Sequence, residues 1–333
     1  MGTPAQSGST SARTIPVGDT TTEPCQRTLR DIPRSTVTWD MESGDYWGIY
    51  ADGRPWIDPT TTKQKFLKYS GAQGTFDIAF DAASRTITMR VIVLVVPMRV
   101  RQIDPRNPKV SETVPYESTR DTDVKNAESF VKERRAATEI TNLPNMKSAI
   151  EEFLNKNKYK LTIKTCPKSA ENEGASSCES QITVKFVIDF VTDPNETHHA
   201  QVNLYPTATR ADSGNWGELN VQRDDKDTKW MLIPNEHVQQ HETGHLFSFP
   251  DEYFDRGGAI HKKYINTQQQ IDLALATASA DKNMWQGIGR TTLMGPGVYD
   301  PGVKMPSYYL NRVRDWFGRQ TGWDWKVVPH IEA

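Results

Sequence analysis

The chain has 333 residues, of which 36% are hydrophobic and 25% charged, with a formal net charge of -2 at pH 7. This is the composition of an ordinary globular protein with a full hydrophobic core. The small net charge gives no electrostatic basis for binding nucleic acid or an anionic membrane, and the longest apolar run, residues 91–96, is far shorter than the ~20 residues of a membrane-spanning helix.

Residues 1–35 are rich in Ser, Thr, Gly and Pro and have almost no periodic apolar pattern, which predicts a flexible tail. They contain no hydrophobic segment of the kind that a secretory signal needs. We therefore expect a protein of the cytoplasm of the producing cell, or one that is exported by a non-classical route or secreted after loss of a signal. Two interpretations of the tail stay open: an inert linker, or a segment that binds a delivery or assembly partner.

Residues 36–84 contain several Trp and Gly residues and predict a small β-rich N-terminal region, followed by a larger domain at residues 85–333. Across the boundary between these two parts, residues 75–80 and 85–96 are apolar or alternating and are joined by a short polar segment. This pattern predicts a hairpin that leads into a long, buried central strand.

Two helices are expected next, at residues 124–140 and 145–158. The second has one apolar face with helical spacing, made of Met146, Ile150, Phe153 and Leu154. Three further strands are expected at residues 159–165, 181–191 and 199–206. Cys166 and Cys178 flank a polar loop between the first two of these strands, where free thiols and a disulfide bridge are both open.

The segment HVQQHETGHLFSFPDEY, residues 237–253, places three histidines four residues apart. On a helix His237, His241 and His245 would form one stripe, but the outer two lie roughly 12 Å apart along the axis, so only an adjacent pair can share an ion. Glu242 selects the pair, because His241, Glu242 and His245 make HExxH: two ligands on one face beside a carboxylate that can take a proton. His237 is then a surface histidine or a neighbour of the ligands.

A catalytic zinc usually has three protein ligands. Asp251 lies ten residues after His241, where the longer signature HExxHxxGxxH places its third ligand, and residues 291–297, TTLMGPG, are similar to a Met-turn. Together these motifs resemble the metzincin clan of zinc endopeptidases, in the snapalysin-like variant whose third ligand is an aspartate. The sequence departs from the clan at Ser248, where the clan has the Gly that turns the chain back toward the metal.

This resemblance implies an α+β fold: a mixed twisted sheet, an active-site helix, a Met-turn and a C-terminal helix, here at residues 306–318 with Gly318 as its stop. It implies Zn²⁺ as cofactor and a polypeptide as substrate. An edge strand near residues 199–222 would bind that substrate in extended form.

By the same resemblance, the metal ligands are His241, His245 and Asp251, with Glu252 as the alternative third ligand because Ser248 alters the turn. Glu242 is the general base and acid, and Met294 supports the ligands from below. Tyr299 and Tyr253 are candidates for stabilising the oxyanion that forms from the substrate, and Tyr299 is also the candidate for substrate binding.

Two other functions stay open. One is a non-catalytic structural or binding component of a larger assembly with a metal-stabilised site, although structural zinc has no need of Glu242 as a base. The other is a gluzincin-type peptidase, whose third ligand is a glutamate on a later helix.

Overall fold

The computed structural model of the chain describes residues 29–40, 44–48, 66–69, 73–104, 106–117, 130–164, 181–223, 229–232, 237–249, 259–261, 292–295, 302–329 and 331. The strands are β1 (Ile32–Asp40), β2 (Gly44–Gly48), β3 (Phe66–Tyr69), β4 (Gln73–Asp81), β5 (Thr86–Asp104), β6 (Asn107–Val114), β7 (Tyr116–Glu117), β8 (Phe130–Arg134), β9 (Lys160–Ile163), β10 (Ile182–Val191), β11 (Ala200–Arg210), β12 (Asn215–Arg223), β13 (Trp230–Leu232), β14 (Ala259–His261) and β15 (Trp325–Val328). The helices are α2 (Leu143–Asn155), α3 (Val238–Leu246) and α5 (Asn311–Thr321), with short 3-10 helices η3 (Ala137–Glu139) and η6 (Ser307–Leu310).

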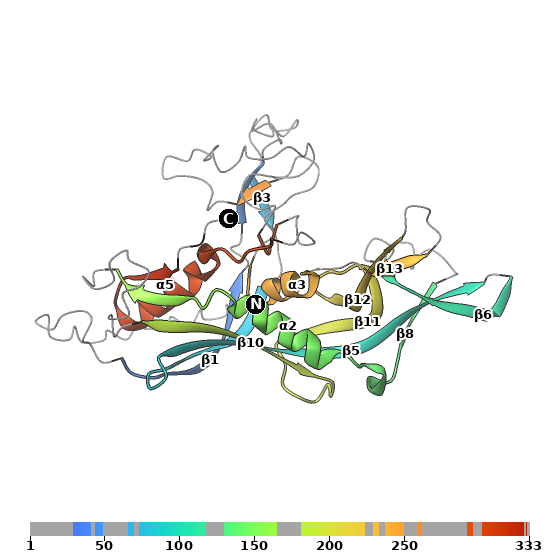
Figure 1. The fold of residues 1–333 in the computed structure, drawn as a ribbon, viewed down its shortest axis with the longest axis horizontal. Helices are drawn as coiled ribbons and strands as arrows, with labels where there is room; N and C mark the ends of the chain where they lie inside the picture. The colour runs from blue at the N-terminus through green and yellow to red at the C-terminus, as the bar shows by residue number, and fades with distance from the viewer. Residues whose placement is uncertain are drawn as a thin grey trace, which may run out of the picture.

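A 12-stranded mixed sheet is the frame of the molecule, and its main path runs in the order β13-β12-β11-β5-β10-β9-β15 (Figure 1). The central strand β5 pairs with β10 and β11 in parallel, and with β4, β6 and β8 in antiparallel. A second sheet, of three strands, has the order β14-β2-β3. The described residues therefore form a mixed α+β structure that is mostly sheet, as the sequence predicts.

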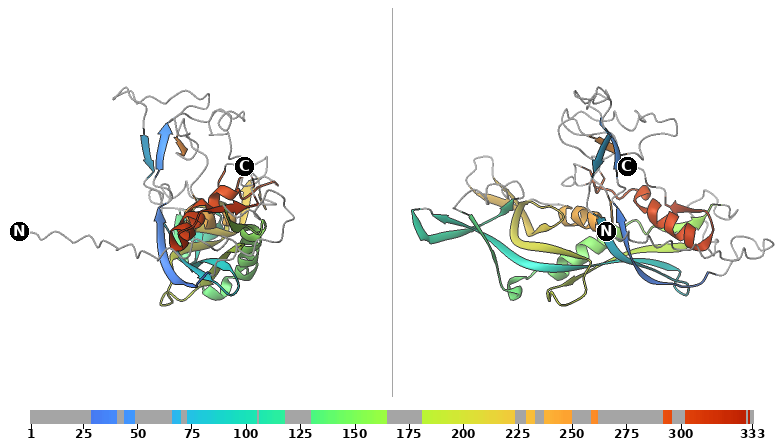
Figure 2. Two further views of the ribbon diagram at one scale, coloured as in Figure 1. Left: turned by 90° about the vertical axis from the view of Figure 1, so that its left-hand side faces the viewer. Right: turned by 180° about the vertical axis from the view of Figure 1, so that it is seen from behind.

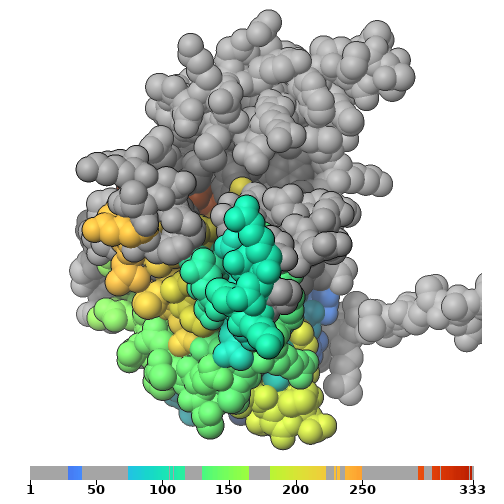
Figure 3. All heavy atoms as spheres, turned by 90° about the vertical axis from the view of Figure 1, so that its right-hand side faces the viewer, coloured from blue at the N-terminus to red at the C-terminus, as the bar shows by residue number. Residues whose placement is uncertain are grey.

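The middle of β5 confirms the predicted buried strand. Val93, Leu94, Val95 and Val96 are all buried, so both faces of the strand are covered there. Branched side chains suit such a position, because they are stiff and pack well on a pleated surface. The strand continues well past residue 96, and its far end pairs with β6 and β8 to form an arm at the opposite end of the sheet from α5 (Figure 1; Figure 2, right). Figure 3 looks along the molecule from the side of this arm.

The predicted hairpin is also confirmed, since β4 and β5 pair in antiparallel across a short turn. The predicted boundary at residue 84 falls in this turn, between two paired strands of one sheet. β1 extends the same sheet through β4 and already begins at Ile32, within the segment expected to be a tail. The boundary therefore does not separate two sheets.

Helix α2 confirms the second predicted helix, and its buried residues are the four expected: Met146, Ile150, Phe153 and Leu154. The expected helix at 124–140 is wrong over residues 130–140, where β8 and η3 lie instead, and residues 124–129 lie outside the described residues. The cause is tertiary pairing. Glu133 receives a 2.6 Å hydrogen bond from Arg99 on the neighbouring strand, and the buried Arg135 guanidinium pairs with Glu218 of β12. Such contacts outweigh helix propensity.

The C-terminal helix forms with its expected inner residues Leu310, Val313 and Phe317 buried. Its predicted stop is wrong: Gly318 lies inside α5, and the helix ends at Gly322, whose φ of 73° is left-handed. A left-handed C-cap favours glycine, which has no Cβ to clash. Among the described helices, none is long and apolar enough to cross a membrane.

Candidate metal centre

Helix α3 carries the HExxH residues, and His237 lies at its N-cap. The helix is almost fully enclosed: His241 is 5% exposed, Glu242 7% and His245 8%. The two imidazole rings lie on one face with their centroids 4.9 Å apart and their planes at 88°. This is the adjacent pair that the position of Glu242 predicts.

Both histidines are oriented by backbone carbonyl groups. His241 Nδ1 lies 2.7 Å from the Leu293 carbonyl oxygen, and His245 Nδ1 lies 2.9 Å from that of Phe249. A carbonyl oxygen can only accept a hydrogen bond, so each Nδ1 must donate. In this tautomer the lone pair of a neutral imidazole is on Nε2, as a metal ligand requires. The two side chains therefore fit a zinc site in chemistry as well as in spacing.

The segment expected as a Met-turn forms a tight turn at residues 292–295, in which Gly295 N–H donates to the Thr292 carbonyl oxygen at 3.0 Å. Met294 is fully buried, and its backbone N–H donates to the Tyr309 hydroxyl at 3.1 Å. Its side chain lies directly against α3, because a Cβ built on Gly244 would meet Met294 Sδ at 2.6 Å. The turn therefore packs against the helix one residue before His245.

The end of α3 resolves the question raised by Ser248. This residue has a φ of 68°, in the left-handed region that the clan's glycine would adopt. Ser248 N–H donates to His245 O and Phe249 N–H donates to Gly244 O, both at 2.9 Å. This pair of bonds is a Schellman motif, and it reverses the chain directly after the helix. Ser248 therefore forms the turn that was expected to require a glycine.

His237 lies one turn before the pair and is held differently. Its ring packs on Phe153, with centroids 4.7 Å apart. Burial, and next the charge of Lys156, lower its pKa below the ordinary value. Its Nδ1 atom is buried and has no hydrogen-bond partner in the described part of the chain.

The remaining predicted site residues, Asp251, Glu252, Tyr253 and Tyr299, lie outside the described residues, as do Cys166 and Cys178. Over the described ranges, no group of three or more His, Cys, Asp or Glu side chains is placed to hold a metal. The described part of the site thus contributes two candidate ligands, His241 and His245, and a third would have to come from elsewhere.

Two contributors were missed by the motif analysis. Gly244 directly precedes the second histidine of HExxH. Its lack of a side chain matters because the Met294 side chain packs against it, a contact that only the structure shows. Tyr309 holds the turn by its hydroxyl and stacks on Phe249 at 4.8 Å. A glycine inside a predicted helix is the signal that could have indicated the first. The second comes from a distant segment and leaves no local signal.

Comparison with known proteins finds no matching family model, no matching curated protein and no matching solved structure.

Proposed function

We propose that the protein is a zinc-dependent endopeptidase. His241 and His245 would hold the metal, with Asp251 as third ligand and Glu252 as its alternative. The observation that carries the proposal is the pair of Nδ1 hydrogen bonds to Leu293 and Phe249, which sets both imidazoles in the ligand tautomer beside a glutamate on the same helix.

Zinc bound there supplies a Lewis acid that polarises the scissile carbonyl and makes water more acidic. The chain supplies the proton transfers. A carboxylate oxygen of Glu242 takes a proton from the attacking water, and the same oxygen then delivers it to the nitrogen of the leaving amine. Because Glu242 is 7% exposed, this transfer takes place largely away from bulk solvent.

The turn at Met294 and the Schellman motif at Ser248 provide rigidity. Both histidines take their orientation from carbonyl groups within these two turns. Ligands positioned in this way lose little further freedom when the metal binds, which favours tight binding.

The decisive experiment compares Glu242→Gln with the parent. Glutamine fills the same space but takes no proton at neutral pH, so we expect the variant to keep its zinc and thermal midpoint and to lose at least about a hundredfold in cleavage of casein. Glu196→Gln, which neutralises an exposed acid in a surface turn, is the matched control and should cleave normally.

A chelator should stop the parent, and added Zn²⁺ should restore it. Near-parental cleavage by Glu242→Gln would contradict the mechanism. A parent that binds one zinc and cleaves no unstructured protein would favour the structural, non-catalytic alternative.

A further inference from the structure

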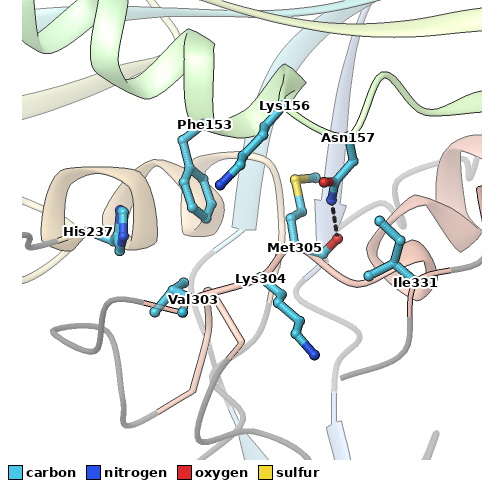
Figure 4. Close-up of a pocket in the computed structure, with 9 residues that line it drawn as sticks. Phe153, Lys156, Asn157, His237, Val303, Lys304, Met305 and Ile331 are labelled. Carbon is cyan, nitrogen blue, oxygen red and sulfur yellow. Dashed lines mark hydrogen bonds between the residues drawn. The ribbon is translucent and has the colours of Figure 1, made fainter.

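A pocket of about 350 Å³ lies beside the start of α3, between that helix, the end of α2 and the segment that follows residue 301 (Figure 4). Its apolar lining comes from three separate parts of the chain: Phe153, Val303, Met305 and Ile331. Three nitrogen-bearing side chains complete the lining together with Asn157: Lys156, His237 and Lys304.

Two backbone hydrogen bonds connect the residues of the pocket to those of the candidate metal centre. His241 N–H donates to the His237 carbonyl oxygen at 2.8 Å within α3. Leu293 N–H donates to the Lys304 carbonyl oxygen at 2.8 Å, while the Leu293 carbonyl oxygen holds His241 Nδ1. The pocket and the candidate site thus share helix α3 and one backbone contact between Leu293 and Lys304.

The walls of this pocket are fixed. Met305 is anchored through its carbonyl oxygen, which accepts a 3.0 Å hydrogen bond from Asn157 and a second bond from the Tyr159 hydroxyl. The amide of Asn157 is therefore already engaged. Phe153, Val303 and Met305 line the pocket and are packed into the protein on their other sides, so the apolar part of the wall is formed before any ligand binds.

Among the described residues that line the pocket, the charged side chains have one sign, and none is Asp or Glu. In the described part of the chain, neither Lys156 nor Lys304 takes part in an ion pair, and both side chains are exposed. Figure 4 shows Lys156 reaching from the end of α2 toward the His237 side of the pocket. The unpartnered Nδ1 of His237 adds a third group, which as the N–H tautomer donates a hydrogen bond without being charged.

We infer that this pocket binds an acidic side chain of the polypeptide substrate, with the methylene stem of a glutamate on the apolar walls and its carboxylate between Lys156 and His237. Lys304 points toward the other side of the pocket and adds positive charge there (Figure 4). The inference rests on the proposed function, since it takes the polypeptide at the metal centre as the ligand. A carboxylate there would gain the Lys156 ammonium group as a partner and would accept a hydrogen bond from His237 Nδ1, a buried atom that is otherwise without one.

Binding can be measured without cleavage, on the full-length Glu242→Gln protein loaded with zinc. The probes are fluorescein-labelled alanine-rich hexapeptides with one Glu at each position in turn, each paired with the same peptide carrying Gln. We expect one Glu position to bind about fivefold to tenfold tighter than its Gln partner in fluorescence anisotropy, because two exposed ammonium groups each contribute modestly.

Two variants test the assignment of the pocket. Lys156→Met combined with Lys304→Met should reduce the Glu to Gln ratio to about one, and Lys156→Glu combined with Lys304→Glu should invert it. Lys185→Met, which removes an exposed ammonium from β10, is the control and should leave the ratio unchanged. Equal affinity for Glu and Gln at every position, or a ratio that survives both lysine changes, would overturn the inference.

The inference and the proposed function fail separately. Tight, lysine-dependent binding of the Glu peptide without cleavage by the parent would leave the pocket assigned and overturn the peptidase. Cleavage by the parent without any preference for Glu would do the reverse.

Discussion

The hydroxyl of Ser248 donates a 2.8 Å hydrogen bond to the carbonyl oxygen of Trp39, 209 residues away in the chain. The bond joins the end of the HExxH helix to β1. It also offsets part of the cost of a left-handed backbone at a residue with a Cβ, which is about 1 kcal/mol or more. The turn behind the candidate ligands is thus held by a strand from the opposite end of the sequence.

Two substitutions at Ser248 separate strain from hydrogen bonding. Ser248→Ala keeps the strain and loses the bond, so we expect the free energy of unfolding to fall by about 1–2 kcal/mol. Ser248→Gly loses the bond and the strain together, so its loss should be less than half as large. Urea denaturation followed by tryptophan fluorescence would measure both. A glycine variant no more stable than the alanine variant would show that the left-handed backbone at Ser248 carries no strain.

Gly74 of β4 should tolerate no side chain. A Cβ there would lie 2.6 Å from both the Leu246 carbonyl oxygen and the Ser248 nitrogen, which are backbone atoms that cannot turn aside. We expect Gly74→Ala to reduce the free energy of unfolding by at least about 2 kcal/mol. Gly302→Ala is the control, because a Cβ at Gly302 meets nothing within 4 Å, and it should change stability by less than about 0.5 kcal/mol.

The contact between Gly244 and Met294 can be isolated with a double-mutant cycle. Gly244→Ala should cost about 2 kcal/mol and lower zinc affinity, because the new methyl group displaces Met294 from beneath the helix. In a Met294→Ala background the space is vacant, so the same substitution should cost less than half as much. Strict additivity, read from thermal midpoints and metal content, would argue against the contact.

The ion cluster between α2 and β10 should make stability depend on pH. Burial alone would raise the pKa of Asp189, but hydrogen bonds from Lys147 and Arg90, both of 2.6 Å, outweigh it, and the pKa is lowered. A carboxyl whose pKa is lower in the folded state adds stability above its unfolded pKa of about 3.9 and loses it as pH falls through the folded value.

We therefore expect Asp189→Asn to lower the free energy of unfolding by roughly 1 kcal/mol at pH 7, and by progressively less below about pH 4. Asp324→Asn removes a carboxylate that is 79% exposed and should show little effect at either pH. A difference between parent and Asp189→Asn that stays constant from pH 7 to pH 2 would contradict the assignment.

Metal content after dialysis against a mild chelator should rank the candidate ligands. If His241, His245 and Asp251 hold the ion, Asp251→Ala leaves two ligands and should lose zinc by orders of magnitude in affinity, because an anionic donor is removed. Glu252→Ala should keep most of the metal, and His237→Ala should resemble the parent. An empty site in His237→Ala together with a full site in Asp251→Ala would move the metal one turn earlier and overturn the peptidase proposal.

The sequence predicts elements well where one periodicity dominates. Helix α2 has its four expected buried residues, and the pairing of His241 with His245 follows from helical spacing and from Glu242 alone. The sequence predicts the local conformation poorly where contacts with residues far away in the chain determine it. Arg135 belongs to an irregular segment because it pairs with Glu218. Ser248 adopts a left-handed turn where its hydroxyl donates to the Trp39 carbonyl oxygen and its backbone packs closely against Gly74. No local window contains those partners.

The length of β5 has a consequence for the order in which the chain acquires its structure. This strand can pair at once with β4, its neighbour in sequence, but its parallel partner β10 follows much later, with the Arg90 and Asp189 side chains that meet across them 99 residues apart. During synthesis an apolar hairpin must therefore wait, with one edge uncovered, for roughly another hundred residues to emerge. The protein should fold slowly, and nascent chains that end before β10 should be the species that chaperones hold and that aggregate first.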